Sequence, residues 1–136
     1  MSNSKYILPV FSQSAEVLKK HTKGPGTRYV FCDHENNPDG QVYVIVRVVN
    51  DVNRPEQHVE DHFHEVDSLW LFEGNENDLT GLQVEVKLGD EVYVLDSPAS
   101  VYIPAGVMHN YRFIKGSGQY TNIVLAQGGN YNKITQ

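Results

Sequence analysis

The chain has 136 residues, a formal net charge of −6 and 11 lysines and arginines. This length fits one domain with its own hydrophobic core. The basic residues are scattered, which argues against nucleic acid as a partner because a phosphate-binding surface needs clustered positive charge. No apolar run approaches the length of a membrane span, and residues 1–10 lack the features of a secretion signal. We therefore expect a cytoplasmic protein that does not bind membranes.

The N-terminal residues predict an arm and one short helix. Residues 6–11 form an apolar segment interrupted by Pro9, which an edge strand or a docking arm tolerates because an edge amide need not donate to a ladder. The segment 12–22 predicts a helix, since a serine can cap its start, Glu16 lies early and two lysines lie late, as the helix dipole prefers. The sequence Gly-Pro-Gly at 24–26 ends it.

From residue 27 onward the pattern predicts short β-strands. Residues 41–49 place four valines on one face and a mixed set of side chains on the other, and 82–88 also alternate between apolar and polar side chains. The single cysteine, Cys32, lies in an apolar run and is expected to be a buried, inert thiol. Short strands separated by Pro, Gly and Ser predict a single all-β domain of the sandwich or barrel type. The predicted strands are 28–32, 41–49, 82–88, 92–95, 101–103, 109–114 and 119–126.

Three histidines form a candidate metal site. His62 and His64 are two residues apart, so in an extended segment both imidazoles can point to the same centre. Two histidines hold a metal poorly, but a third, His109, stands at the head of a later strand. It follows a Pro-Ala-Gly turn at 104–106, in which proline fixes the entry and glycine permits a backbone angle that other residues avoid.

The order His-x-His, then Pro-x-Gly-x-x-His, in a chain of short strands resembles the cupin superfamily over residues 40–126. The matching residues are His62, His64 and Gly74 in the first motif of that family and Pro104, Gly106 and His109 in the second.

This resemblance implies a double-stranded β-helix, or jelly-roll barrel, with the N-terminal arm and helix of residues 1–26 outside it. It also implies one divalent transition metal (Fe, Mn, Ni or Zn) on His62, His64 and His109, a small-molecule ligand in the barrel interior, and a homodimer. Because imidazole accepts several divalent ions, the three histidines do not select the metal.

The acidic ligand of the first cupin motif is not clear in this chain. Counting forward from His64 by the usual spacing reaches Ser68, whereas counting back from Gly74 reaches Asp67. Strand parity places residues 62, 64 and 68 on one face, although a β-bulge could turn Asp67 inward. Glu85, on a neighbouring predicted strand, is a third candidate. Asp67 and Glu85 are therefore both candidates for catalytic base, and Asp67 is also a candidate metal ligand.

The chemistry depends on this position. Two histidines and a carboxylate are the ligand set of non-haem Fe(II) oxygenases. Three neutral histidines leave the full charge of the ion, which favours an anionic substrate and Lewis-acid chemistry. We therefore expect a metal-dependent enzyme acting on a small anionic or oxygenated molecule, with isomerase, lyase or cyclase chemistry slightly favoured over a dioxygenase. The alternative is a non-catalytic small-molecule binding or sensing module with a structural or vestigial metal site.

Aromatic and hydrogen-bonding side chains on the predicted strands are candidates for the ligand pocket, because barrel interiors accept such groups. The candidate substrate-binding residues are Tyr43, Arg47, Tyr102 and Tyr111.

Overall fold

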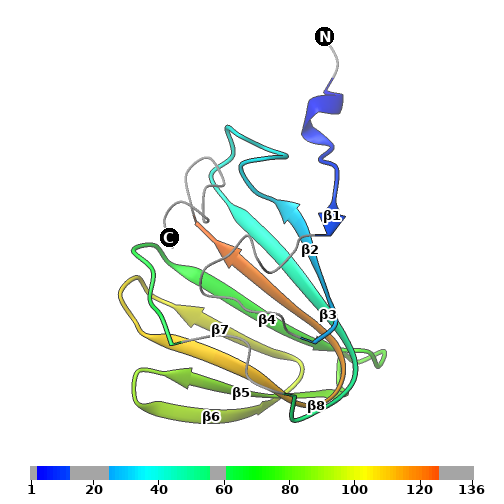
Figure 1. Cartoon of the computed structure of the whole chain (residues 1–136), viewed down its shortest axis with the longest axis vertical. Coiled ribbons are helices and arrows are strands. Elements are labelled where there is room, and N and C mark those ends of the chain that lie inside the picture. Colours follow the sequence, from blue (N-terminus) through cyan, green and yellow to red (C-terminus); the bar gives the residue numbers. More distant parts are fainter. Residues whose placement is uncertain (1–2, 13–24, 56–60, 126–136) are drawn as a thin grey trace.

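The computed structural model describes residues 3–12, 25–55 and 61–125, which fold almost entirely into antiparallel β-structure (Figure 1). The elements in chain order are η1 (Ser4–Tyr6), β1 (Phe11–Ser12), β2 (Thr27–Cys32), β3 (Tyr43–Asn53), β4 (Ser68–Gly74), β5 (Leu82–Leu88), β6 (Glu91–Asp96), β7 (Ala99–Ile103) and β8 (His109–Val124). The described ranges contain one 3-10 turn and no α-helix, and no helical segment in them could cross a membrane. The predicted helix at 12–22 lies outside them, apart from Ser12, which belongs to β1.

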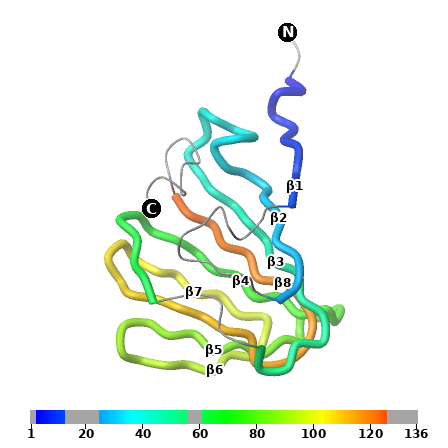
Figure 2. Tube along the Cα trace, viewed as in Figure 1, coloured from blue at the N-terminus to red at the C-terminus, as the bar shows by residue number. Residues whose placement is uncertain are grey.

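Strand β8 connects two parts of the sheet. One part has the order β1-β2-β3-β8-β4-β7, and β5 and β6 extend from β8 as a separate branch. The first half of β8 pairs with β5, and its second half runs between β3 and β4. The chain bends between these halves, so that β1 and β2 lie at one end of the molecule and the β5–β6 hairpin at the other (Figure 2).

The bend in β8 depends on Gly116. Its φ angle is 107°, and a Cβ atom there would lie 1.9 Å from the carbonyl oxygen of Gly81. Only glycine combines this backbone angle with so close an approach of another strand. The sequence predicted two strands, 109–114 and 119–126, because residues 116–118 resemble a turn. The structure corrects this prediction to one bent strand, since Gly116 pairs with β3 and β5 and Gly118 pairs with β3 and β4.

The predicted closed barrel is not shown by the described residues. Among them, β1, β6 and β7 each pair on one side only, so the sheet folds over its core without closing. The other predicted strands are confirmed within a few residues, and β5 has the predicted bounds.

The core lies on the inner face of the folded sheet. On β3 this face is the mixed one: Tyr43, Ile45, Arg47 and Val49 are all buried. On the uniformly apolar face Val46 is buried, but Val44 is half-buried and Val48 is 40% exposed. A sheet that encloses a polar interior has to turn its mixed face inward, and successive side chains on a strand alternate between the two faces. The interior therefore combines an aromatic core with buried polar groups.

Candidate metal centre

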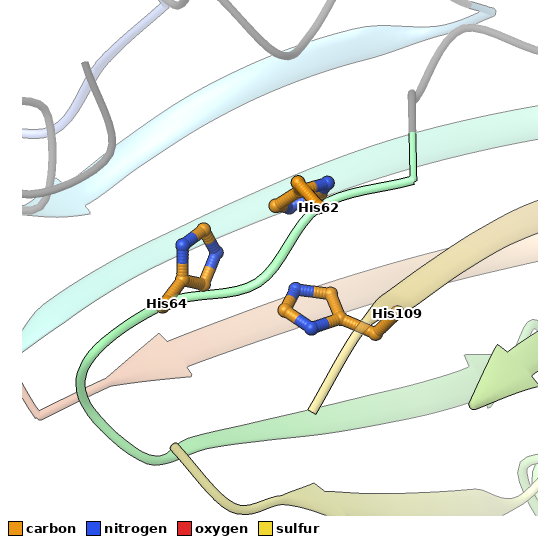
Figure 3. A group of neighbouring side chains, drawn as sticks. All are labelled: His62, His64 and His109. Carbon is orange, nitrogen blue, oxygen red and sulfur yellow. The ribbon is translucent and has the colours of Figure 1, made fainter. Parts of the chain in front are cut away.

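The structure brings together three imidazoles from two distant parts of the chain. His62, His64 and His109 are all buried, and one ligand atom from each lies within 4.8 Å of those of the other two. Their ring centroids are 4.4–4.9 Å apart. In Figure 3 the rings converge, with His62 and His64 on the loop before β4 and His109 at the start of β8. The arrangement could hold one metal ion.

Backbone hydrogen bonds fix the spacing between the two segments that carry the histidines. The amide of His109 donates to the carbonyl of His62 at 2.7 Å, and the amide of His62 donates back at 3.2 Å. The Gly106 amide donates to the His64 carbonyl at 2.8 Å. Gly106 has a φ of 87°, which explains the glycine of the Pro-x-Gly turn. The turn is thus connected directly to the His-x-His segment.

A side-chain network next to the triad reinforces this connection. The Asp61 carboxylate, adjacent to His62, accepts a hydrogen bond from the Asn110 amide at 2.7 Å. It also pairs with the Lys87 ammonium group at 2.6 Å. Asp61 precedes His62 and Asn110 follows His109. The hydrogen bond between Asn110 and Asp61 therefore lies beside the β-bridge that joins His62 and His109. Such outer contacts orient metal ligands in other proteins.

The protonation of the triad fits metal binding. Burial, with the neighbouring imidazoles, lowers the pKa of His64 to about 3 and that of His109 to about 4. Both rings are therefore neutral near pH 7, and neutral imidazole is the form that ligates metals. The Nδ1 atom of His109 lies 2.9 Å from the Val107 carbonyl oxygen. With Nδ1 as the donor, the Nε2 lone pair is available to an ion.

The structure does not bring Asp67 or Glu85 to the triad. The Asp67 carboxylate accepts hydrogen bonds from the Tyr102 hydroxyl and, at 2.8 Å, from the Ala105 amide. Glu85 lies on the outer face of β5, opposite to the buried Val84 and Val86. No described carboxylate belongs to the cluster. Asp67 instead holds the Pro-x-Gly turn that precedes His109.

Ser68 occupies the inner face at the position expected by strand parity. It is 3% exposed, and its hydroxyl oxygen forms no hydrogen bond with any described residue. It shares that face of β4 with Trp70, whose ring lies 5.3 Å from the His109 ring. Ser68, rather than Asp67, therefore presents its side chain to the interior near the triad.

The role of Asp67 predicts a pH-dependent contribution to stability. The hydrogen bond from Tyr102, followed by that from the Ala105 amide, lowers the pKa of Asp67. A carboxyl whose pKa is lower in the folded state stabilises the fold above its unfolded pKa of about 4, and this contribution is lost as the pH falls through the folded value. We expect Asp67→Asn to lower the thermal midpoint most near pH 7 and progressively less below about pH 4.

Thermal unfolding of wild type and Asp67→Asn between pH 3 and pH 7 measures this difference. Asp39→Asn, at an exposed turn carboxylate, is the matched control and should follow the wild-type curve. Parallel pH curves for wild type and Asp67→Asn would refute the proposed role of Asp67.

Three of the four predicted pocket residues lie in the interior. Tyr43, Arg47 and Tyr111 are 0%, 3% and 2% exposed, respectively. Tyr111 follows His109 by two residues on the same face of β8. Tyr102, in contrast, is 57% exposed on β7 and contacts Asp67 on the outside.

Arg28 and Asn122 are among the buried polar residues that the sequence analysis missed. Arg28 is 5% exposed on β2 and donates to the Tyr43 hydroxyl at 2.7 Å. Asn122 is 3% exposed on β8, opposite Trp70 in the β4–β8 ladder. Strand parity could have identified Arg28, since it lies on the same strand face as the buried Val30 and Cys32. The sequence carried no comparable signal for Asn122, because buried and exposed residues were not distinguished along 119–126.

No protein-family model matches the chain, and no curated protein matches it significantly. Solved structures do resemble it. An RmlC-like cupin from Shewanella frigidimarina is 16% identical, with a TM-score of 0.53 over 84% of this chain and 89% of that one. A variant of oxalate decarboxylase from Bacillus subtilis is 12% identical, with a TM-score of 0.56 over 91% of this chain but 31% of the decarboxylase.

An iron(II) form of HppE is also similar, with 14% identity and a TM-score of 0.51 over 86% of this chain and 56% of HppE. These structures are all cupins, so the protein described here has the cupin fold.

Proposed function

We propose that the protein is a metal-dependent enzyme acting on a small anionic or oxygenated organic molecule. The observation that carries the proposal is the convergence of three buried imidazoles from two chain segments. Converging neutral imidazoles suit a divalent ion, because imidazole nitrogen is a common metal ligand. An iron(II) form of HppE, a protein of the same fold, supports a metal at such a site.

The ligand set favours Lewis-acid chemistry. A divalent ion on His62, His64 and His109 would keep its full charge and polarise a substrate carbonyl or carboxylate. The described residues add no carboxylate to the triad, so isomerase, lyase or cyclase chemistry is favoured over oxygenation. Trp70 forms one wall of the site and helps exclude water from it, since its ring lies against His109. The metal is Fe, Mn, Ni or Zn.

Metal analysis of the purified protein tests the proposal. Wild type should retain one divalent ion per chain, and a His62→Ala and His109→Ala double variant should retain almost none. Equal, low metal contents would refute the metalloenzyme proposal. If wild type turns over a small carboxylate or carbonyl compound, this turnover should disappear in the double variant. Turnover by wild type should not consume O2 in stoichiometric amounts.

A non-catalytic binding or sensing module is the second candidate, and the absence of a described carboxylate at the triad favours it. It would bind metal and small molecules without turnover. The homodimer, the single domain over residues 1–136 and the cytoplasmic location stay predictions.

A further inference from the structure

A cavity lies at the end of β5 that is remote from the metal centre, beside the bend of β8 (Figure 1). Its volume is about 360 Å³, which is within the range of small-molecule sites. Leu82 at this end of β5 pairs with Gly116, whereas Leu88 at the other end pairs with His109. The strand between Leu82 and Leu88 spans about 20 Å at 3.3 Å per residue. The cavity is therefore separate from the three histidines.

Two opposite charges line this cavity. Gln83 pairs with Lys115 on one side and with Asp96 on the other. Paired residues direct their side chains to the same face of a sheet, so the three side chains form one row. The Gln83 amide donates to the Asp96 carboxylate at 3.0 Å. Neither Lys115 nor Asp96 has an ion-pair partner among the described residues, so both charges are available to a ligand.

A buried hydroxyl group lies in the same cavity wall. Ser97 is 5% exposed, and its Oγ atom accepts a hydrogen bond from the Leu82 amide at 3.1 Å. The Ser97 amide donates back to the Leu82 carbonyl at 2.8 Å, which fixes the position of the residue. No residue in the described ranges accepts the proton of its hydroxyl. A serine hydroxyl has one donor, and here that donor is free to bind an oxygen atom of a ligand.

We propose that this cavity binds a small α-amino acid in its zwitterionic form. The Lys115 ammonium group and the Ser97 hydroxyl bind the carboxylate of the amino acid, and the Asp96 carboxylate binds its ammonium group. A ligand with a single charge would leave either Lys115 or Asp96 without a partner. This inference goes beyond the proposed function and does not depend on it.

The spacing of the two charges fits such a ligand. Lys115 and Asp96 are two strands apart, and neighbouring strands are about 4.8 Å apart, so their Cα atoms are separated by about 10 Å. An α-amino acid with a hydrogen bond of about 2.8 Å at each end spans about 9 Å between its two partners. Leu82 and Gly116 add apolar atoms to the cavity lining, which suits a short aliphatic side chain.

Binding of L-alanine to the full-length protein tests the proposal. Ligand-observed NMR titrations compare L-alanine with propionate and ethylamine, which each keep only one of its two charges, at equal ionic strength. Each analogue should bind about fivefold more weakly than L-alanine, the loss typical of one partly exposed charged contact. Equal affinity of either analogue and L-alanine would overturn the zwitterion site.

Two substitutions locate the binding site. Lys115→Gln and Asp96→Asn should each weaken L-alanine binding about fivefold, and Asp96→Asn keeps an oxygen that accepts from Gln83. Lys5→Gln and Asp90→Asn are the matched controls, because both residues are exposed outside the cavity lining. They should bind L-alanine as wild type does. Wild-type affinity in Lys115→Gln or Asp96→Asn, or an equal loss in the matched control, would overturn the proposal.

The same titration before and after treatment with a chelator separates this cavity from the metal centre. L-alanine should bind both preparations equally, because the cavity lies at the other end of β5. Binding that disappears with the metal would place the amino acid at the three histidines and overturn the inference.

Discussion

Replacement of His109 by alanine should lower the affinity for divalent metal by more than about 100-fold. The loss of outer-shell partners alone lowers metal affinity about 10–100-fold in other proteins, and His109 offers a ligand atom itself. The backbone contacts with His62 are made by main-chain atoms, so the local fold should persist. Competition with a chromophoric chelator measures the change.

His34→Ala is the matched control for this substitution. His34 is a half-buried histidine at a turn and does not belong to the triad. The control should bind metal with wild-type affinity. An affinity loss in His34→Ala equal to that in His109→Ala, or no loss in His109→Ala, would contradict the metal site.

Truncation of Phe72 should destabilise the fold by about 3–5 kcal/mol, the range for a buried phenylalanine replaced by alanine. Phe72 is fully buried, and its ring contacts those of Trp70, Tyr111 and Tyr120 at centroid distances of 5.3–6.2 Å. The substitution would leave a cavity in the aromatic cluster that supports His109. Urea unfolding of the metal-free protein measures the free energy change.

Phe31→Ala provides the comparison. Phe31 is 44% exposed on β2, so the same change in side chain should lower the free energy of unfolding by less than about 1 kcal/mol. Similar losses for both variants would show that the interior is not packed around Phe72 as described.

The sequence predicted most strands and the convergence of the three histidines because both depend on short-range patterns. Alternation identified β5, and the spacing of His62 and His64 placed both imidazoles on one side. The Pro-x-Gly turn indicated that His109 begins a strand, and the cupin resemblance joined it to the other two histidines. Each of these signals is local, so it could be read without knowing which strands pair.

Long-range pairing explains what the sequence did not predict. The position of the carboxylate depended on whether Asp67 turns inward, and the contacts with Tyr102 and Ala105 that hold it outside come from residues more than 30 positions away. The sequence placed Tyr43 and Arg47 in the interior only because barrel interiors accept such groups, since which face of β3 is buried depends on the strands that cover it. Periodicity alone favours burial of the uniformly apolar face.

X-ray absorption at the edge of the bound metal tests the central claim most directly. The spectrum of the metal-loaded wild type should show outer-shell scattering from three imidazoles, with metal–nitrogen distances of about 2.0–2.1 Å if the ion is zinc. The spectrum of Asp67→Asn should be the same, because Asp67 holds the turn outside the site. Fewer than three imidazoles, or a protein carboxylate that disappears in Asp67→Asn, would contradict the three-histidine centre.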